Sequence, residues 1–217
     1  MPLIDIDSII SLNGIEILLW DATESSDELI SLCHYRNIKV DTSILPKAES
    51  RRREILAEAL ILSEYFSTPK VLLHDENGAP IVDGYNGFIS ISHTHGLVAV
   101  AFSHYAPIGI DAERISERVM KVRGKFINDE EAQFIVATDS TENTLAWTAK
   151  EAIYKLVNTP GASLRNDFHI CSCFRKASVD HFSADAYIEH SGNRRLISIS
   201  SILCQEQSTI LTAAVYL

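Results

Sequence analysis

The 217-residue sequence predicts an α+β fold in which two similar α/β lobes have a pseudo-twofold arrangement. One reason is the order of elements, because each half of the chain runs from an apolar strand through a long helix to a final apolar strand. Another is the tetrapeptide Ile-Ser-Ile-Ser, which recurs at equivalent places, residues 89–92 and 197–200. We therefore expect an N-terminal lobe over residues 1–106 and a C-terminal lobe over residues 107–217, with the ligand site in the cleft between them.

The composition is that of a globular protein without a basic surface. Hydrophobic residues make up 46% of the chain and charged residues 22%, and the net charge is −10. This charge argues against nonspecific binding to nucleic acids or anionic membranes, so an anionic substrate needs a local basic pocket. The four cysteines show no metal-site spacing, and residues 1–7 lack an export signal. We expect buried free thiols and a cytoplasmic protein that spans no membrane.

The first lobe is predicted to pack a sheet against one strong helix. Residues 15–20 are typical of a largely buried strand, and residues 49–66 have the apolar stripe of an amphipathic helix. Three arginines, residues 51–53, lie in the first turns of this helix, where cations oppose the helix dipole. They indicate either a functional site or exposed solubilising side chains.

A β-hairpin is predicted next, from residues 88–93 and 97–102, with His93 at its mouth. A single histidine at a strand end is more often a structural residue than a ligand. His93 is therefore a candidate only in combination with other residues.

The second lobe begins with a strand that carries two acids. Residues 108–113 place Asp111 and Glu113 on the same side of this strand, two positions apart. Two such carboxylates repel each other unless a cation lies between them, and Mg²⁺ is typically held by a few carboxylates together with substrate phosphates. The structural alternative is an exposed edge strand that ends in a polar loop.

The remainder of the second lobe is predicted as helices followed by strands. Asn128 and Glu131 have the spacing of a capping box, which predicts a helix through Val136. A further helix is predicted from about Leu145 to Val157. The expected strands are residues 168–174, 184–190, 195–200 and 210–216.

The sequence WTAKEAIYK within this last helix is the strongest candidate for a site. At about 100° per residue, Trp147, Lys150, Glu151, Tyr154 and Lys155 fall on one face, and the opposite face is apolar. Glu/Lys pairs at this spacing often belong to a solvated face and stabilise a helix by only about 0.2–0.5 kcal/mol. The two aromatic rings instead favour a polyanion site, with lysines for phosphates and a carboxylate for a metal or a proton.

Three motifs occur in a fixed order: Ser-His-Thr at residues 92–94, Gly-Ile-Asp-Ala-Glu at 109–113, and Trp-x-x-Lys-Glu-Ala-x-x-Lys at 147–155. In this order and spacing the chain resembles the 4′-phosphopantetheinyl transferases, in particular the larger single-chain type that activates carrier proteins of surfactin and other peptide synthetases. The resemblance covers residues 50–157 and is architectural beyond them. It implies a two-lobed fold and transfer of the phosphopantetheine arm of coenzyme A to a serine of an acyl or peptidyl carrier protein, with release of adenosine 3′,5′-bisphosphate.

The resemblance also implies roles for the acids and lysines of the second lobe. Asp111, Glu113 and Glu151 bind Mg²⁺ together with the pyrophosphate of coenzyme A. Lys150 and Lys155 contact the same phosphates, and Glu151 takes the proton of the serine. Glu151 and Lys155 are thus the expected catalytic residues.

Coenzyme A is further expected to contact the N-terminal lobe. By the same resemblance, Ser92 and His93 hold its 3′-phosphate, and Arg53 lies near the adenine and that phosphate. Ala79 stands where family members often carry a basic residue. Residues 158–168 correspond in position to the region that contacts the carrier protein.

Two other functions stay open at the level of sequence. One is a non-catalytic member of the family that binds coenzyme A or carrier proteins, which the missing basic residues favour. The other is a Mg²⁺-dependent enzyme that acts on a different nucleotide. Because a pseudo-dimeric chain already contains its lobe interface, we expect a monomer; the sequence does not indicate which carrier protein is served.

Overall fold

The described part of the chain is a mixed α/β structure with two main sheets and four α-helices, which confirms the predicted class at this level. The computed structural model describes residues 10–12, 15–204, 206 and 208–217. The segment at residues 1–7, in which no export signal is expected, lies outside the described residues. No helix in the described part of the chain is long and apolar enough to cross a membrane.

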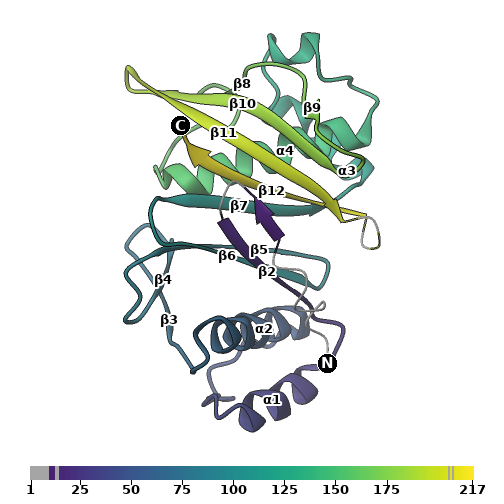
Figure 1. Cartoon of the computed structure of the whole chain (residues 1–217). Helices are drawn as coiled ribbons and strands as arrows, with labels where there is room; N and C mark the ends of the chain where they lie inside the picture. The colour runs from purple at the N-terminus through teal and green to yellow at the C-terminus, as the bar shows by residue number, and fades with distance from the viewer. Residues whose placement is uncertain (1–9, 13–14, 205, 207) are drawn as a thin grey trace.

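The first sheet and its helices come from the N-terminal half. Their elements are β1 (Ile10–Leu12), β2 (Ile15–Asp21), α1 (Ser26–Tyr35), α2 (Glu49–Phe66), β3 (Leu72–His74), β4 (Pro80–Val82), β5 (Phe88–Thr94) and β6 (Leu97–Ser103). The sheet is antiparallel with the order β1-β2-β6-β5, and β3 pairs with β4 as a separate hairpin. Helix α2 lies under this sheet and α1 lies beyond it, as Figure 1 shows.

The second sheet and its helices come from the C-terminal half. Their elements are β7 (Ile108–Arg114), α3 (Glu117–Lys121), the 3-10 helices η2 (Arg123–Lys125) and η3 (Glu131–Gln133), α4 (Ser140–Val157), β8 (Phe168–Ile170), β9 (Arg175–Lys176), β10 (His181–His190), β11 (Asn193–Cys204) and β12 (Thr209–Tyr216). The strand order is β7-β12-β11-β10-β8, and β9 pairs with β10. The order β7-β12-β11 repeats the order β2-β6-β5 of the first sheet.

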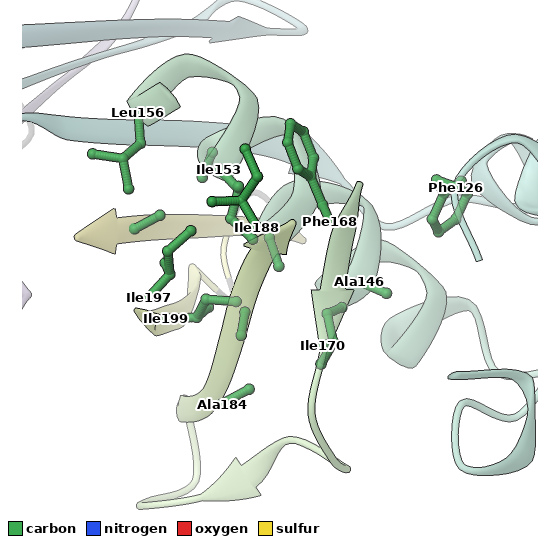
Figure 2. Packing of buried hydrophobic residues seen from close by; sticks show 14 of the residues in the cluster. Phe126, Ala146, Ile153, Leu156, Phe168, Ile170, Ala184, Ile188, Ile197 and Ile199 are labelled. Carbon is green, nitrogen blue, oxygen red and sulfur yellow. The ribbon is translucent and has the colours of Figure 1, made fainter. Parts of the chain in front are cut away.

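Helix α4 buries its apolar side against the second sheet. Figure 2 shows Ile153 and Leu156 of the helix near Phe168, Ile188 and Ile197, all members of one buried cluster. Full burial of each such side chain stabilises the fold by about 1.5–3 kcal/mol. This packing fixes the rotation of α4 about its axis and therefore decides which of its polar residues reach a cleft.

An apolar layer also joins the two sheets. β2 and β6 contribute Ile17, Leu19 and Ala99 to it, and β7 and β12 contribute Ile110 and Leu211. The other face of β2 and β6 packs against α2. Because both faces of these strands are buried, residues 17–20 and 97–102 are continuously apolar and lack the alternation of a half-exposed strand.

The segment after Asn128 differs from the prediction. Asn128 and Glu131 make both capping-box hydrogen bonds, each 2.9 Å long, but only the short helix η3 follows, not a helix through Val136. The carboxylate of Glu131 also accepts hydrogen bonds from the backbone of Ile170 and from Lys150. These contacts tie the segment to β8 and α4 and hold it as a buried turn.

The cysteines are free thiols, as expected, but they are not uniformly buried. Cys33 lies on the buried side of α1, in the apolar core of the first half. This burial raises the pKa of its thiol to about 11. Cys171 and Cys173 are exposed, because the predicted strand over residues 168–174 ends at Ile170.

Candidate active site

The candidate site begins where strands β5 and β7, at the edges of the two sheets, lie next to each other. Alternate residues of β5 carry small hydroxyl groups on the side that faces β7. The Ser90 hydroxyl accepts a hydrogen bond from the backbone N–H of Ile110, and the Ser92 hydroxyl accepts one from Ala112, both 3.0 Å long. Side-chain hydroxyls thus join these two strands and fix their register.

The same hydroxyl groups orient the two acids of β7. Ser92 donates a hydrogen bond of 2.9 Å to Oδ1 of Asp111, and Thr94 donates one of 3.2 Å to Oε1 of Glu113. Both carboxylates therefore point from β7 toward β5, as their spacing of two residues predicts. The sequence analysis did not assign this role to Thr94, although Thr94 belongs to the Ser-His-Thr motif.

Gly109 allows α4 to approach β7 closely. A Cβ atom at this position would lie 1.9 Å from the backbone oxygen of Ala152 and 2.5 Å from the backbone nitrogen of Leu156. Only glycine fits such a contact without displacing the helix. The close approach brings Glu151 and Lys155 of α4 beside the acids of β7.

These elements surround a cleft of about 370 Å³. Its lining comprises Ile91, Ser92, His93, Asp111, Ala112, Glu113, Trp147, Glu151 and Lys155. Residues from both sides of the expected boundary near residue 106 therefore line one cavity, and three carboxylates and one ammonium group meet in it. Trp147 forms part of its wall and packs edge to face against Phe126, with ring centres 5.2 Å apart.

The lining of this cleft contains more carboxylates than ammonium groups. Lys155 donates a hydrogen bond of 2.8 Å to Asp111. Burial raises the pKa of Glu151, the negative charges of Asp111 and Glu113 raise it further, and Lys155 opposes the shift. Within the described ranges, no three His, Cys, Asp or Glu side chains are gathered closely enough to form a ready metal site. The carboxylates share the cleft while each of the two β7 acids is bound by protein donors.

The comparison with known proteins covers most of this site. Residues 107–200 match the model of the 4′-phosphopantetheinyl transferase superfamily. The resemblance to the phosphopantetheinyl transferases is confirmed. A curated relative from Aneurinibacillus migulanus, named 4′-phosphopantetheinyl transferase gsp, is 32% identical over 117 residues. This alignment covers 48% of the present chain and 48% of the relative, so the chain spans about half the length of the curated relative that it matches.

The phosphopantetheinyl transferase match contains the acids and the lysines of the second lobe, but Lys150 does not lie in the cleft. Lys150 is 0% exposed, forms an ion pair of 2.6 Å with Glu131 and donates a hydrogen bond of 2.5 Å to the backbone of Phe126. At about 100° per residue, Lys155 is about 40° from Glu151 around the helix, whereas Lys150 and Lys155 are about 140° apart. Lys150 is thus held in a buried ion pair with Glu131 and is not among the residues that line the cleft, and its expected contact with the phosphates stays a prediction.

Ser92 lines the cleft and makes its hydrogen bonds within the protein, and its expected contact with coenzyme A stays a prediction. It is buried, and its hydroxyl both donates to Asp111 and accepts from Ala112. This hydroxyl is therefore used within the contact between β5 and β7. Its neighbour His93 does line the cleft, and its Nε2 atom lies 2.6 Å from Oε1 of Glu58.

Arg53 lies apart from the residues that line the cleft. Its guanidinium donates a hydrogen bond of 3.1 Å to the backbone oxygen of Ala22, just after β2, and its buried Nε atom has no hydrogen-bond partner among the described residues. Arg53 thus links the start of α2 to the loop that follows β2. Its expected contact with the adenine stays a prediction.

A smaller hollow of about 200 Å³ adjoins the cleft and shares Ile91 and Lys155 with it. Ala79, which stands where a basic residue is common in the family, lines this hollow and offers no charge there. Asn158 at the end of α4 closes one side and donates a hydrogen bond of 3.1 Å to Asp75 of the first half.

Proposed function

We propose that the protein transfers the 4′-phosphopantetheine group of coenzyme A to a serine hydroxyl of an acyl or peptidyl carrier protein. The observation that carries this proposal is the convergence of Asp111, Glu113, Glu151 and Lys155 on one cleft. A group of three acids and a lysine suits the handling of a pyrophosphate through a divalent cation. The family match over residues 107–200 and the printed name of the relative support the same reaction.

The acids of the cleft fit a hard divalent cation. They offer only carboxylate oxygens, which Mg²⁺ prefers, and burial, followed by the charges of the neighbouring acids, raises the pKa of Glu151, so a cation among these carboxylates would be favourable. Asp111, Glu113 and Glu151 would hold Mg²⁺. When bound, the ion would neutralise negative charge on the pyrophosphate and orient it.

The residues of the chain then divide the reaction between them. The serine oxygen attacks the phosphorus that carries the pantetheine arm, the bond to the bridging oxygen of the pyrophosphate breaks, and adenosine 3′,5′-bisphosphate leaves. Glu151 accepts the serine proton, and its raised pKa brings it nearer to the pH at which a general base works well. Lys155 donates to the phosphates, and His93, on the β5 side of the cleft, binds the 3′-phosphate.

We also propose that the two halves are pseudo-twofold lobes, at residues 1–106 and 107–217. The repeated strand order β2-β6-β5 and β7-β12-β11 supports this, as does the position of Ile-Ser-Ile-Ser on the third strand of each set. A cytoplasmic location, a monomeric state and a carrier contact at residues 158–168 stay predictions of the sequence.

The proposed reaction is tested by incubating the protein with an apo carrier protein, coenzyme A and Mg²⁺, and weighing the carrier by mass spectrometry. We expect the carrier to gain one phosphopantetheinyl group, and we expect Glu151→Gln to abolish the gain while keeping the fold. No gain with several fatty-acid and peptide-synthetase carriers would refute the proposal.

A non-catalytic function is the second candidate. It is favoured by the small amount of positive charge that the site offers to phosphates. Lys155 is already paired with Asp111, and Ala79 supplies no charge. Calorimetric binding of coenzyme A without any transfer would support this candidate. A preference for ATP over coenzyme A in competition would instead indicate a different nucleotide enzyme.

A further inference from the structure

A buried acid of α2 contacts the histidine of the cleft. Glu58 is 5% exposed, and its Oε1 atom lies 2.6 Å from Nε2 of His93. Its neighbours along the helix, Leu56 and Leu60, belong to the apolar core beneath the first sheet. A carboxylate at such a position is costly unless it is paired, so its placement against His93 calls for an explanation.

The contact determines which atom of the imidazole ring a ligand meets. An ionised carboxylate only accepts hydrogen bonds, so the Nε2 atom of His93 carries the hydrogen in this contact. The Nδ1 atom has no hydrogen-bond partner among the described residues, and the side chain is 24% exposed where it lines the cleft. With Nε2 held by Glu58, Nδ1 is the ring atom available to a ligand.

An anion at this position requires a donor. Nδ1 donates to a phosphate oxygen when both ring nitrogens carry hydrogen, and the hydrogen on Nε2 is already directed to Glu58. The guanidinium of Arg51 lies 3.5 Å from the same carboxylate oxygen and offsets its negative charge. The contact therefore directs the Nδ1 edge of the ring to the cleft, with the acid behind it.

We propose that Glu58 is a positioning residue that keeps a hydrogen on Nε2 of His93 and fixes the orientation of the ring, and thereby sets the affinity of the cleft for the 3′-phosphate of coenzyme A. This inference rests on the proposed function, in which His93 binds that phosphate. Glu58 does not touch the substrate itself. Its effect should therefore depend on both the histidine and the 3′-phosphate, whereas a general role in stabilising α2 would depend on neither.

The chain offers a matched control on the same helix. Glu54 lies one turn before Glu58 and forms an ion pair of 2.9 Å with Arg51. Glu54→Gln removes a carboxylate from α2 and a partner from Arg51 but leaves the pairing of Glu58 with His93 in place.

The test compares coenzyme A with dephospho-coenzyme A, which lacks the 3′-phosphate. We expect Glu58→Ala to raise KM for coenzyme A about 10-fold, equivalent to about 1.4 kcal/mol, with little change in kcat or in the use of dephospho-coenzyme A. Glu58→Gln should recover part of the loss, because its amide oxygen still accepts from Nε2. In a His93→Ala background the Glu58 substitution should have no further effect, and Glu54→Gln should behave like the parent protein.

Several outcomes would overturn the proposal. They are an equal loss with both substrates, an undiminished loss in the His93→Ala background, or the same loss in Glu54→Gln. Circular dichroism and thermal unfolding identify variants that fail to fold, in which case Glu58→Gln carries the comparison.

Nitrogen-15 NMR of labelled histidine separates this inference from the proposed function, because it needs no turnover. We expect hydrogen on Nε2 of His93 in the parent protein and a mixture of tautomers in Glu58→Ala. An identical ring signal in both proteins would overturn the positioning role. A parent protein that shows the expected ring signal but transfers nothing would instead refute the transferase function.

Discussion

The ion pair between Lys150 and Glu131 allows a direct test of whether Lys150 stabilises the fold or binds phosphates. In Lys150→Met, a side chain of similar length fills the same space without its charge. If Lys150 is structural, the variant should lose stability and keep its use of coenzyme A. If Lys150 instead binds phosphates, the variant should keep its stability and lose affinity for coenzyme A.

The magnitude follows from burial. Lys150 is 0% exposed and Glu131 is 1% exposed, so removal of the ammonium leaves a buried carboxylate without its cation. Loss of one partner of such a pair costs about 3–5 kcal/mol. The carboxylate keeps its hydrogen bonds from Asn128 and Ile170, which places the expected loss near the lower end of that range.

Urea denaturation of the parent protein and the variant measures this loss as a difference in free energy of unfolding. The double variant Lys150→Met/Glu131→Gln is the control, because it removes both charges and keeps an acceptor for the backbone donors. Its cost should be smaller than the sum of the costs of Lys150→Met and Glu131→Gln by about 0.5–3 kcal/mol. The reasoning is refuted if Lys150→Met unfolds like the parent protein and its KM for coenzyme A rises 10-fold or more.

Four further results are expected. In Gly109→Ala, the new methyl group would lie 1.9 Å from a backbone oxygen of α4. Thermal and urea unfolding should therefore show that the free energy of unfolding falls by about 3 kcal/mol or more. Stability equal to that of the parent protein would contradict the close approach of α4 to β7. Lys155→Ala should lower kcat/KM for coenzyme A about 100-fold with the fold intact, because it removes the ammonium of the cleft; unaltered kinetics would exclude Lys155 from catalysis. Burial and the nearby carboxylates raise the pKa of Glu151, so the metal-free protein should lose stability as pH rises from the ordinary value of 4.5 through the raised value. Urea titrations across pH should therefore show Glu151→Gln becoming more stable relative to the parent protein as pH rises, and a pH-independent difference would speak against the shift. Thr94→Val removes the hydroxyl that donates to Glu113 and should weaken Mg²⁺ binding roughly 10-fold by calorimetry; equal affinity in both proteins would count against this orienting role.

The main elements of the fold could be predicted because their signals are local. The helix at residues 49–66 has the predicted bounds, and the strands at residues 15–20, 88–93 and 97–102 differ from the structure by one residue at their ends. The segment after Asn128 was mispredicted although its capping-box hydrogen bonds form. There, long-range contacts of Glu131 with Lys150 and β8 outweigh the local preference for a helix.

The candidate site was predictable to the extent that spacing along one element determines it. The two acids of β7 share a side because side chains alternate along a strand, and Lys155 shares a side with Glu151 because the two are four residues apart on a helix. Glu58 was overlooked, although an acid within the apolar stripe of α2 is an unusual residue there. Its contact with His93 joins residues 35 positions apart, which no local pattern reveals.

The sequence by itself determined the class of the fold, the family resemblance and the acids and lysine of the cleft, because each depends on periodicity or on short motifs. Only the tertiary structure decided between the two lysines of α4. The helical wheel spreads both over one broad face, and the packing of α4 against β7 and the second sheet turns Lys155 into the cleft and buries Lys150 beside Glu131. The structure likewise shows Ser92, an expected ligand of coenzyme A, donating a hydrogen bond to Asp111. In both cases the orientation of a polar side chain depends on the neighbouring element that supplies its hydrogen-bond or ion-pair partner. That partner is far away in the sequence.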